Sequence, residues 1–163
     1  MEGEYYIGQV GGNTIVVEVT LSLSTDAYAD GDVLAATQVV TNAARVEGGN
    51  VTWASLVLLD KDDQGGALDI VLLRTNAAIG TENAAVTVSD ANADEICGVV
   101  EIAAADYVDL ANSQIVVKKP ADLGFEMDAA DTSRHLYVAA ISRGTSTYTA
   151  SGITLKLGFW QNN

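Results

Sequence analysis

Three aspartates and two glycines lie together in the stretch DKDDQGG, whose spacing resembles a calcium-binding loop. Asp60, Asp62, Gln64 and Gly65 would fall at the first, third, fifth and sixth positions of a loop of the EF-hand type. The last position, which needs a bidentate glutamate, is Val71, and the flanking runs are typical of strands rather than helices. We expect an acidic turn between two strands, and a calcium loop is the less favoured alternative.

A second group of carboxylates surrounds Gly31 in the stretch AYADGDVLA, which contains Asp26, Asp30 and Asp32. Asp-Gly is a common turn pair. Acid–base catalysis would need a cleft and a raised carboxyl pKa, and the sequence indicates neither. We expect a turn here.

The other chemically active residue types are scarce. His135 is the only histidine and Cys97 the only cysteine, so neither a zinc site nor an intrachain disulfide is expected. The stretch GQVGGN lacks the spacing of a phosphate-binding loop, and there is no nucleophile-elbow sequence. We predict a non-enzymatic protein with no catalytic, metal-ligating or cofactor-binding residues.

The charge of the chain is strongly one-sided. The 163 residues carry 22 acidic and 8 basic side chains, a net charge of −14. A field of this sign repels nucleic acid and anionic lipid, so we expect neither as a partner. No stretch has the length of uninterrupted apolar sequence that a membrane span needs. The N-terminal sequence does not resemble a secretory signal, so we expect assembly in the cytoplasm.

Hydrophobic periodicity predicts the elements that hold these residues. In TIVVEVTLSLS, from Thr14 to Ser24, apolar and polar residues alternate, and ITLKLGFW near the C-terminus does the same. Period two over this length indicates strands with one buried face. Further strand-like runs are expected at Thr37–Thr41, Val51–Leu59, Ala67–Leu73, Ala85–Val88, Gly98–Ile102, Gln114–Lys118 and Leu136–Ser142.

The number of short strands and the thin helical signal determine the fold class. Val51–Leu59 and Ala67–Leu73 are apolar on both faces and should lie centrally, covered on each side. Helical turns are expected only at Ser89–Ile96, capped by Ser89 or Asp90, and at Ala103–Leu110. We predict an all-β fold, a two-sheet antiparallel sandwich of jelly-roll type with eight or nine strands. An immunoglobulin-like sandwich is the alternative.

The chain divides into a short flexible N-terminal arm, residues 1–13, and one β-sandwich domain, residues 14–163. The arm is glycine-rich and carries three candidate interface residues, Tyr5, Tyr6 and Ile7. The loop RGTSTYTASG adds Arg143 and Tyr148, because it is polar, has no carboxylate and joins two of the best predicted strands. Tyrosine and arginine are enriched at interface hot spots. Trp160 completes the set of candidates.

Several blocks together resemble a family of tailed-bacteriophage virion proteins. They are AYADGDVLA, TNAARVEGGNVTWASLVLLDKDDQGGALDIVLL, DYVDL and LYVAAISRGTSTYTASGITLKLGF. The chain is similar, from about Ser24 to the C-terminus, to small acidic β proteins called capsid decoration, cement or auxiliary head proteins. These motifs are strands and turns, so the resemblance carries over no catalytic residue, and residues 1–13 lie outside it.

The resemblance implies a virion protein on the outer capsid surface. It implies binding to the major capsid protein lattice, stabilisation of the shell, and self-association as a homotrimer. The alternative is a head-fibre or tail adhesin domain that binds host-surface glycans. That function would need an exposed aromatic platform, for which Tyr148 with Trp160 or Trp53 are the candidates.

Overall fold

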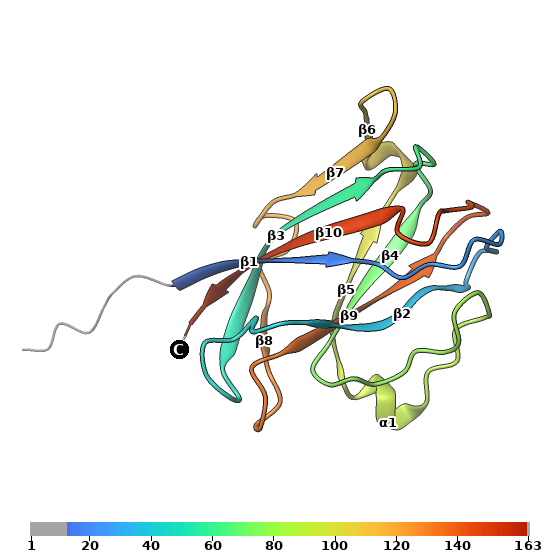
Figure 1. Ribbon diagram of the computed structural model, residues 1–163. Coiled ribbons are helices and arrows are strands. Elements are labelled where there is room, and N and C mark those ends of the chain that lie inside the picture. The colour runs from blue at the N-terminus through green and yellow to red at the C-terminus, as the bar shows by residue number, and fades with distance from the viewer. Residues whose placement is uncertain (1–12, 163) are drawn as a thin grey trace, which may run out of the picture.

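The structure, a computed structural model, describes residues 13–162, which form two facing antiparallel sheets (Figure 1). No helix among these residues is long and apolar enough to cross a membrane. The strands are β1 (Asn13–Thr20), β2 (Val33–Val40), β3 (Asn50–Asp60), β4 (Leu68–Leu73), β5 (Ile96–Ile102), β6 (Val108–Asp109), β7 (Gln114–Lys118), β8 (Glu126–Asp128), β9 (Leu136–Ser142) and β10 (Ile153–Gln161). The helical elements are one turn of α-helix, α1 (Asp90–Ala93), and one 3-10 turn, Ala104–Asp106.

The strand order is that of a jelly roll. One sheet has the order β1-β10-β3-β7-β6, with β8 also pairing with β3, and the other has the order β2-β9-β4-β5. Without the short strands β6 and β8, eight strands remain, four in each sheet. With β6 and β8 left out, the chain crosses between the sheets at β1 to β2, β2 to β3, β3 to β4, β5 to β7, β7 to β9 and β9 to β10. The predicted two-sheet antiparallel sandwich is therefore confirmed, with ten strands instead of eight or nine.

The two alternating stretches near the ends of the described chain pair with each other, as β1 and β10. Val17 lies opposite Leu157, and Val19 lies opposite Leu155, so both strands direct their apolar faces into the space between the sheets. The four inward residues of β10 are all buried: Ile153, Leu155, Leu157 and Phe159. Burial of each such side chain contributes on the order of 2 kcal/mol to folding.

Strand β3 lies in the middle of the large sheet, between β10 and β7. Its register against β10 shifts between Gly158 and Phe159, which is a β-bulge. Trp53 is fully buried beside this bulge, and its indole N–H donates to the carbonyl oxygen of Ser55 at 2.9 Å. Phe125 packs edge-on against the indole, with ring centroids 5.7 Å apart.

The two sheets differ in what covers their outer faces. All six residues of β4 are buried, because a second apolar cluster, which includes Val71, Leu73 and Ile79, lies on the outer side of the small sheet. The segment between β4 and β5 supplies part of that cluster, and it contains α1, capped by the Ser89 side chain as one of the predicted alternatives has it.

Some sequence predictions are wrong in detail. Ala85–Val88 forms no strand and contributes only an isolated bridge between Ala85 and Asp32. The first strand ends at Thr20 rather than Ser24, and Asn13 belongs to it rather than to the arm. Strand β3 is central within its sheet, but its outer face is not covered as predicted: Val57 and Leu59 are only half-buried.

Candidate interaction surface

The outer face of the large sheet carries a set of apolar side chains that no other element of residues 13–162 fully covers. Strand pairing arranges them in rows across the sheet, because residues in register point to the same face. One row contains Leu59, Ile115 and Val108, and the next contains Val57 and Val117. Val108 is 59% exposed and Val117 is 52% exposed. We call this surface, together with Val16 and Trp160, the outer face.

The edge strand and β10 extend the outer face to the other side of the sheet. Val16, 66% exposed, lies opposite Gly158, and Trp160, 43% exposed, lies between Thr14 and Thr52 on the neighbouring strands. These positions are exposed because they alternate with the inward residues of β1 and β10. Of the predicted interface residues that the structure describes, Trp160 is the one that belongs to the outer face.

Charge is sparse on the outer face. Glu18 and Lys156 lie opposite each other across β1 and β10, with their charged atoms 3.9 Å apart. Glu126 and Asp128 lie opposite Thr52 and Asn50 at the sheet margin. Single exposed pairs of this kind contribute little to stability. The outer face therefore carries one basic and three acidic side chains, two of the acidic ones at its margin, on a chain with a net charge of −14.

Arg143, a second predicted interface residue, lies away from the outer face, at the end of β9. Its guanidinium binds the carboxylate of Asp69, with Nε donating to Oδ2 at 2.7 Å, and Asp30 lies 4.0 Å away. The hydrogen bond to Asp69 raises the pKa of Arg143. Its side chain is 45% exposed, so Arg143 neutralises the buried Asp69 while part of the guanidinium remains in contact with solvent.

The position of Tyr148 differs from the sequence prediction. The sequence predicts that the polar loop presents Tyr148 to a partner, whereas the side chain is only 4% exposed. Its ring lies 6.4 Å from that of Tyr28, and its hydroxyl lies against Gly66, where a Cβ atom would approach within 2.8 Å. Burial raises the pKa of Tyr148 to about 12. A loop with polar neighbours gave no periodicity from which this burial could be inferred.

The remaining candidates, Tyr5, Tyr6 and Ile7, lie outside the described residues. Of the three candidates within residues 13–162, Trp160 lies on the outer face, Arg143 lies at the end of β9, and Tyr148 is buried. The aromatic platform of the glycan-binding alternative consists of Tyr148 with Trp160 or Trp53, and the side chains of Tyr148 and Trp53 are buried in the core.

The acidic stretch is a hydrogen-bonded turn. The buried carboxylate of Asp60 accepts backbone N–H groups from Asp62, Gln64 and Gly65 at 2.8–2.9 Å. Asp62 in turn accepts the N–H of Thr149 at 2.7 Å, which joins this turn to the loop after β9. Among residues 13–162, no group of three acidic, histidine or cysteine side chains is placed to hold a metal ion.

The single histidine, His135, and the single cysteine, Cys97, both lie in contacts that belong to the fold. The Nδ1 atom of His135 accepts the backbone N–H of Asn42, which has a φ of 54°. Cys97 is partly buried on β5, and burial raises its thiol pKa to about 11. A thiol with a raised pKa is a poor nucleophile at neutral pH.

No family model matches the chain, and no curated protein matches it. Among solved structures, a chain of Desmodium yellow mottle tymovirus is 12% identical, with 98% of this chain and 87% of that chain covered and a TM-score of 0.29. VP2 of the infectious bursal disease virus subviral particle is 14% identical, covering 91% of this chain and 41% of that chain, with a TM-score of 0.23. Both are viral proteins, but likenesses this distant carry neither fold nor function over to this chain. The family resemblance seen in the sequence stays a prediction.

Proposed function

We propose that the chain is a virion structural protein that decorates the outside of a tailed-phage capsid, with the outer face of the large sheet against the major capsid protein lattice. The observation that carries the proposal is the uncovered apolar outer face. A jelly roll needs to bury only the inner side of each sheet, yet this outer side carries Val57, Val117, Val108 and Trp160. Exposed apolar surface of this kind is typical of interaction sites.

The distribution of charge supports a protein partner. Nucleic acid and anionic lipid are repelled by the net charge of −14. The outer face itself carries few charges: Glu18 and Lys156 form a pair, and Glu126 and Asp128 lie at the margin, so its centre can be desolvated without leaving many charges unpaired. Most acidic side chains of residues 13–162 lie outside the strands, in turns and loops.

The outer face is too small to form a standard protein–protein interface without further contacts. Five strands about 4.8 Å apart and four rows about 6.6 Å apart give a flat area of roughly 400 Å². A standard interface needs about 800 Å² on each partner. The proposal therefore includes further contacts, from Tyr5, Tyr6 and Ile7 or from a homotrimer in which neighbouring copies share one capsid position.

Such binding would stabilise a shell by mass action. A protein that binds the assembled lattice and not its separated subunits shifts the assembly equilibrium toward the intact shell. No catalysis or cofactor is required for this role. The jelly-roll topology is compatible with it, as capsid and lectin domains both use this architecture, but that is an analogy of fold only.

Co-sedimentation with capsids that lack the chain tests the proposal. Val117→Lys places a charge in the middle of the outer face and should lower the bound fraction at least tenfold. Val39→Lys is the matched control, because Val39 is an exposed strand valine, 45% exposed, on the other sheet. Equal binding by wild type and both variants would remove the outer face from the proposal, and no binding by wild type would refute decoration.

A further inference from the structure

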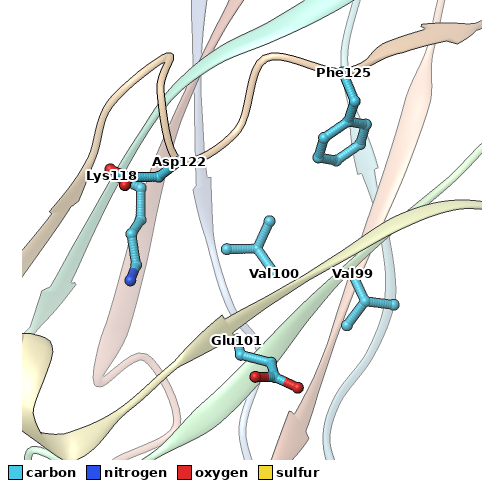
Figure 2. A pocket seen from close by; sticks show the side chains of 6 residues that line it. All are labelled: Val99, Val100, Glu101, Lys118, Asp122 and Phe125. Carbon is cyan, nitrogen blue, oxygen red and sulfur yellow. The ribbon is translucent and has the colours of Figure 1, made fainter.

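The sandwich has two open sides, where the edges of the two sheets face each other. One side is bridged by a side chain, and the other contains a groove. On the side of β1 and β2, Gln38 bridges the edges: its side-chain oxygen accepts the N–H of Ser22 and its amide donates to the carbonyl of Thr20. On the side of β5 and β7 a groove of about 390 Å³ remains. Figure 2 shows Val100 rising from β5 into this groove, with Lys118 and Phe125 on its other wall.

Strand β5 is the edge of the small sheet and pairs with β4 alone. The N–H of Arg143 donates to the carbonyl of Ala67, so odd-numbered residues along β4 direct their backbone groups toward β9. Even-numbered residues then direct theirs toward β5, which agrees with the bond from the N–H of Arg74 to the carbonyl of Glu95.

The register between β4 and β5 shows which residues of β5 hydrogen-bond to β4 through their backbone groups. Ile70 lies opposite Val100, and Leu72 lies opposite Gly98. The backbone N–H and C=O groups of Gly98 and Val100 therefore form hydrogen bonds with β4. The backbone N–H and C=O groups of Val99 and Glu101 point away from β4, toward the free edge of the sheet. Among residues 13–162, no backbone partner outside the sheet is found for either of them.

We infer that β5 accepts an extended peptide segment of a partner protein, which adds to the small sheet as a fifth strand through the backbone groups of Val99 and Glu101. Strand addition to a free sheet edge is a recurrent mode of peptide recognition, in which backbone hydrogen bonds give affinity and neighbouring pockets select side chains. A groove of this volume lies in the range of ligand-binding pockets.

Charge specifies the occupant as a segment in which basic and apolar residues alternate. Glu101 and Asp122 both line the groove, both are exposed, and neither has a salt bridge to residues 13–162. Lys118 is already bound to Asp106 at 2.8 Å. Lysine or arginine side chains of the segment would meet Glu101, which lies on the opposite side of β5 from Val100, and Asp122 adds to the negative potential of the groove (Figure 2). The alternate apolar side chains would face Val100 and Phe125.

This edge would take a strand whether or not the outer face binds a capsid, because the two surfaces share no residue. The test uses nuclear magnetic resonance of the full chain and a short synthetic peptide in which valine alternates with lysine. In the free chain, the amides of Val99 and Glu101 should exchange rapidly with solvent, while those of Gly98 and Val100 are protected. Adding the peptide should shift and protect the amides of Val99 and Glu101.

Variants identify the groups responsible. Val99→Pro removes an N–H that the fold does not use, and proline is tolerated at such edge positions. It should weaken the peptide about tenfold, whereas Val99→Thr, which keeps the N–H, should change affinity less than twofold. Glu101→Gln with Asp122→Asn should weaken it about two- to fivefold, and a valine–glutamate peptide should bind worse than the valine–lysine peptide.

Three results would overturn the inference. They are protection of the Val99 amide in the free chain equal to that of Val100, peptide-induced shifts located on the outer face instead of β5, and undiminished binding by Val99→Pro. Absence of any binding by the valine–lysine peptide would overturn it as well.

Discussion

Val57 and Val117 face each other across β3 and β7 on the outer side of the large sheet, and Val117 is 52% exposed. One residue along each strand, Leu58 and Val116 form the equivalent pair on the inner side, and both are buried. The same alternation therefore places an apolar pair on each side of the sheet, and only the inner pair is explained by folding. The outer pair is the basis of the proposed attachment surface.

Tryptophan emission should report contact at the outer face. Trp53 is fully buried and Trp160 is 43% exposed, so a Trp53→Phe chain has a single, surface-located tryptophan. Upon capsid binding, emission from Trp160 should move to shorter wavelength and become harder to quench with acrylamide, because the ring loses water. A Trp160→Phe chain, which retains only Trp53, is the control and should show neither change.

The turn after β3 should be stabilised by a carboxylate and not by calcium. Asp60→Ala leaves three backbone N–H groups without their acceptor, and should lower the free energy of unfolding by on the order of 3 kcal/mol. Asp63→Asn is the control, because Asp63 is exposed and asparagine tolerates its φ of 56°. Urea denaturation measures both.

Calcium should leave the midpoint of thermal unfolding unchanged, since the oxygens of Asp60 and Asp62 already accept hydrogen bonds within the chain. A calcium-dependent rise in that midpoint, removed by a chelator, would contradict the assignment of this stretch as a turn.

The position of Phe125, which lines the groove beside β5, depends on Gly98. A Cβ atom at Gly98 would overlap the ring of Phe125, so Gly98→Ala should displace that ring and cost about 1–3 kcal/mol of stability. Gly144→Ala is a matched control, because a Cβ atom there meets nothing within 4 Å, and it should change stability by less than about 0.5 kcal/mol. Thermal unfolding of the two variants gives the comparison, and equal midpoints would show that Phe125 does not pack on Gly98.

Alkaline pH should destabilise the fold through its buried tyrosines. Burial raises the pKa of Tyr28 and of Tyr148 from 10.0 to about 12. Between these values the unfolded chain loses the phenol protons that the folded chain retains, so stability falls as pH rises through this window and is unaffected below it. The loss is on the order of 2 kcal/mol per tyrosine.

Urea unfolding at several pH values above and below 10 tests this linkage. Tyr148→Phe should show a shallower alkaline decline than wild type. An identical slope in the two chains would exclude Tyr148 as a contributor.

The sequence predicted the sandwich because its signal is periodic. The alternation at Ile153–Trp160 correctly assigned Ile153, Leu155, Leu157 and Phe159 to the buried side of β10, although Thr154 on the other side is buried as well. Its failures have local causes. Strands β6 and β8 are two and three residues long, which is too short for a pattern, and apolar residues on both sides of β3 do not reveal that only one side is covered.

The candidate surface was less predictable than the fold. Trp160 could be assigned to the outward side of β10 from alternation, but Val117 and Val108 become neighbours only through pairing between strands far apart in the chain. Tyr148 was misjudged because its burial depends on Gly66, a residue of another loop that leaves room for the phenol. Contacts of this kind cannot be read from one segment.

An electron-microscopy map of purified particles that contain this chain tests the central claim most directly. The account predicts density for a two-sheet domain on the outside of the shell, with the large sheet toward the major capsid protein and Val117 and Trp160 at the contact. Particles with this domain absent from the outer surface, or with the large sheet turned to solvent, would contradict it.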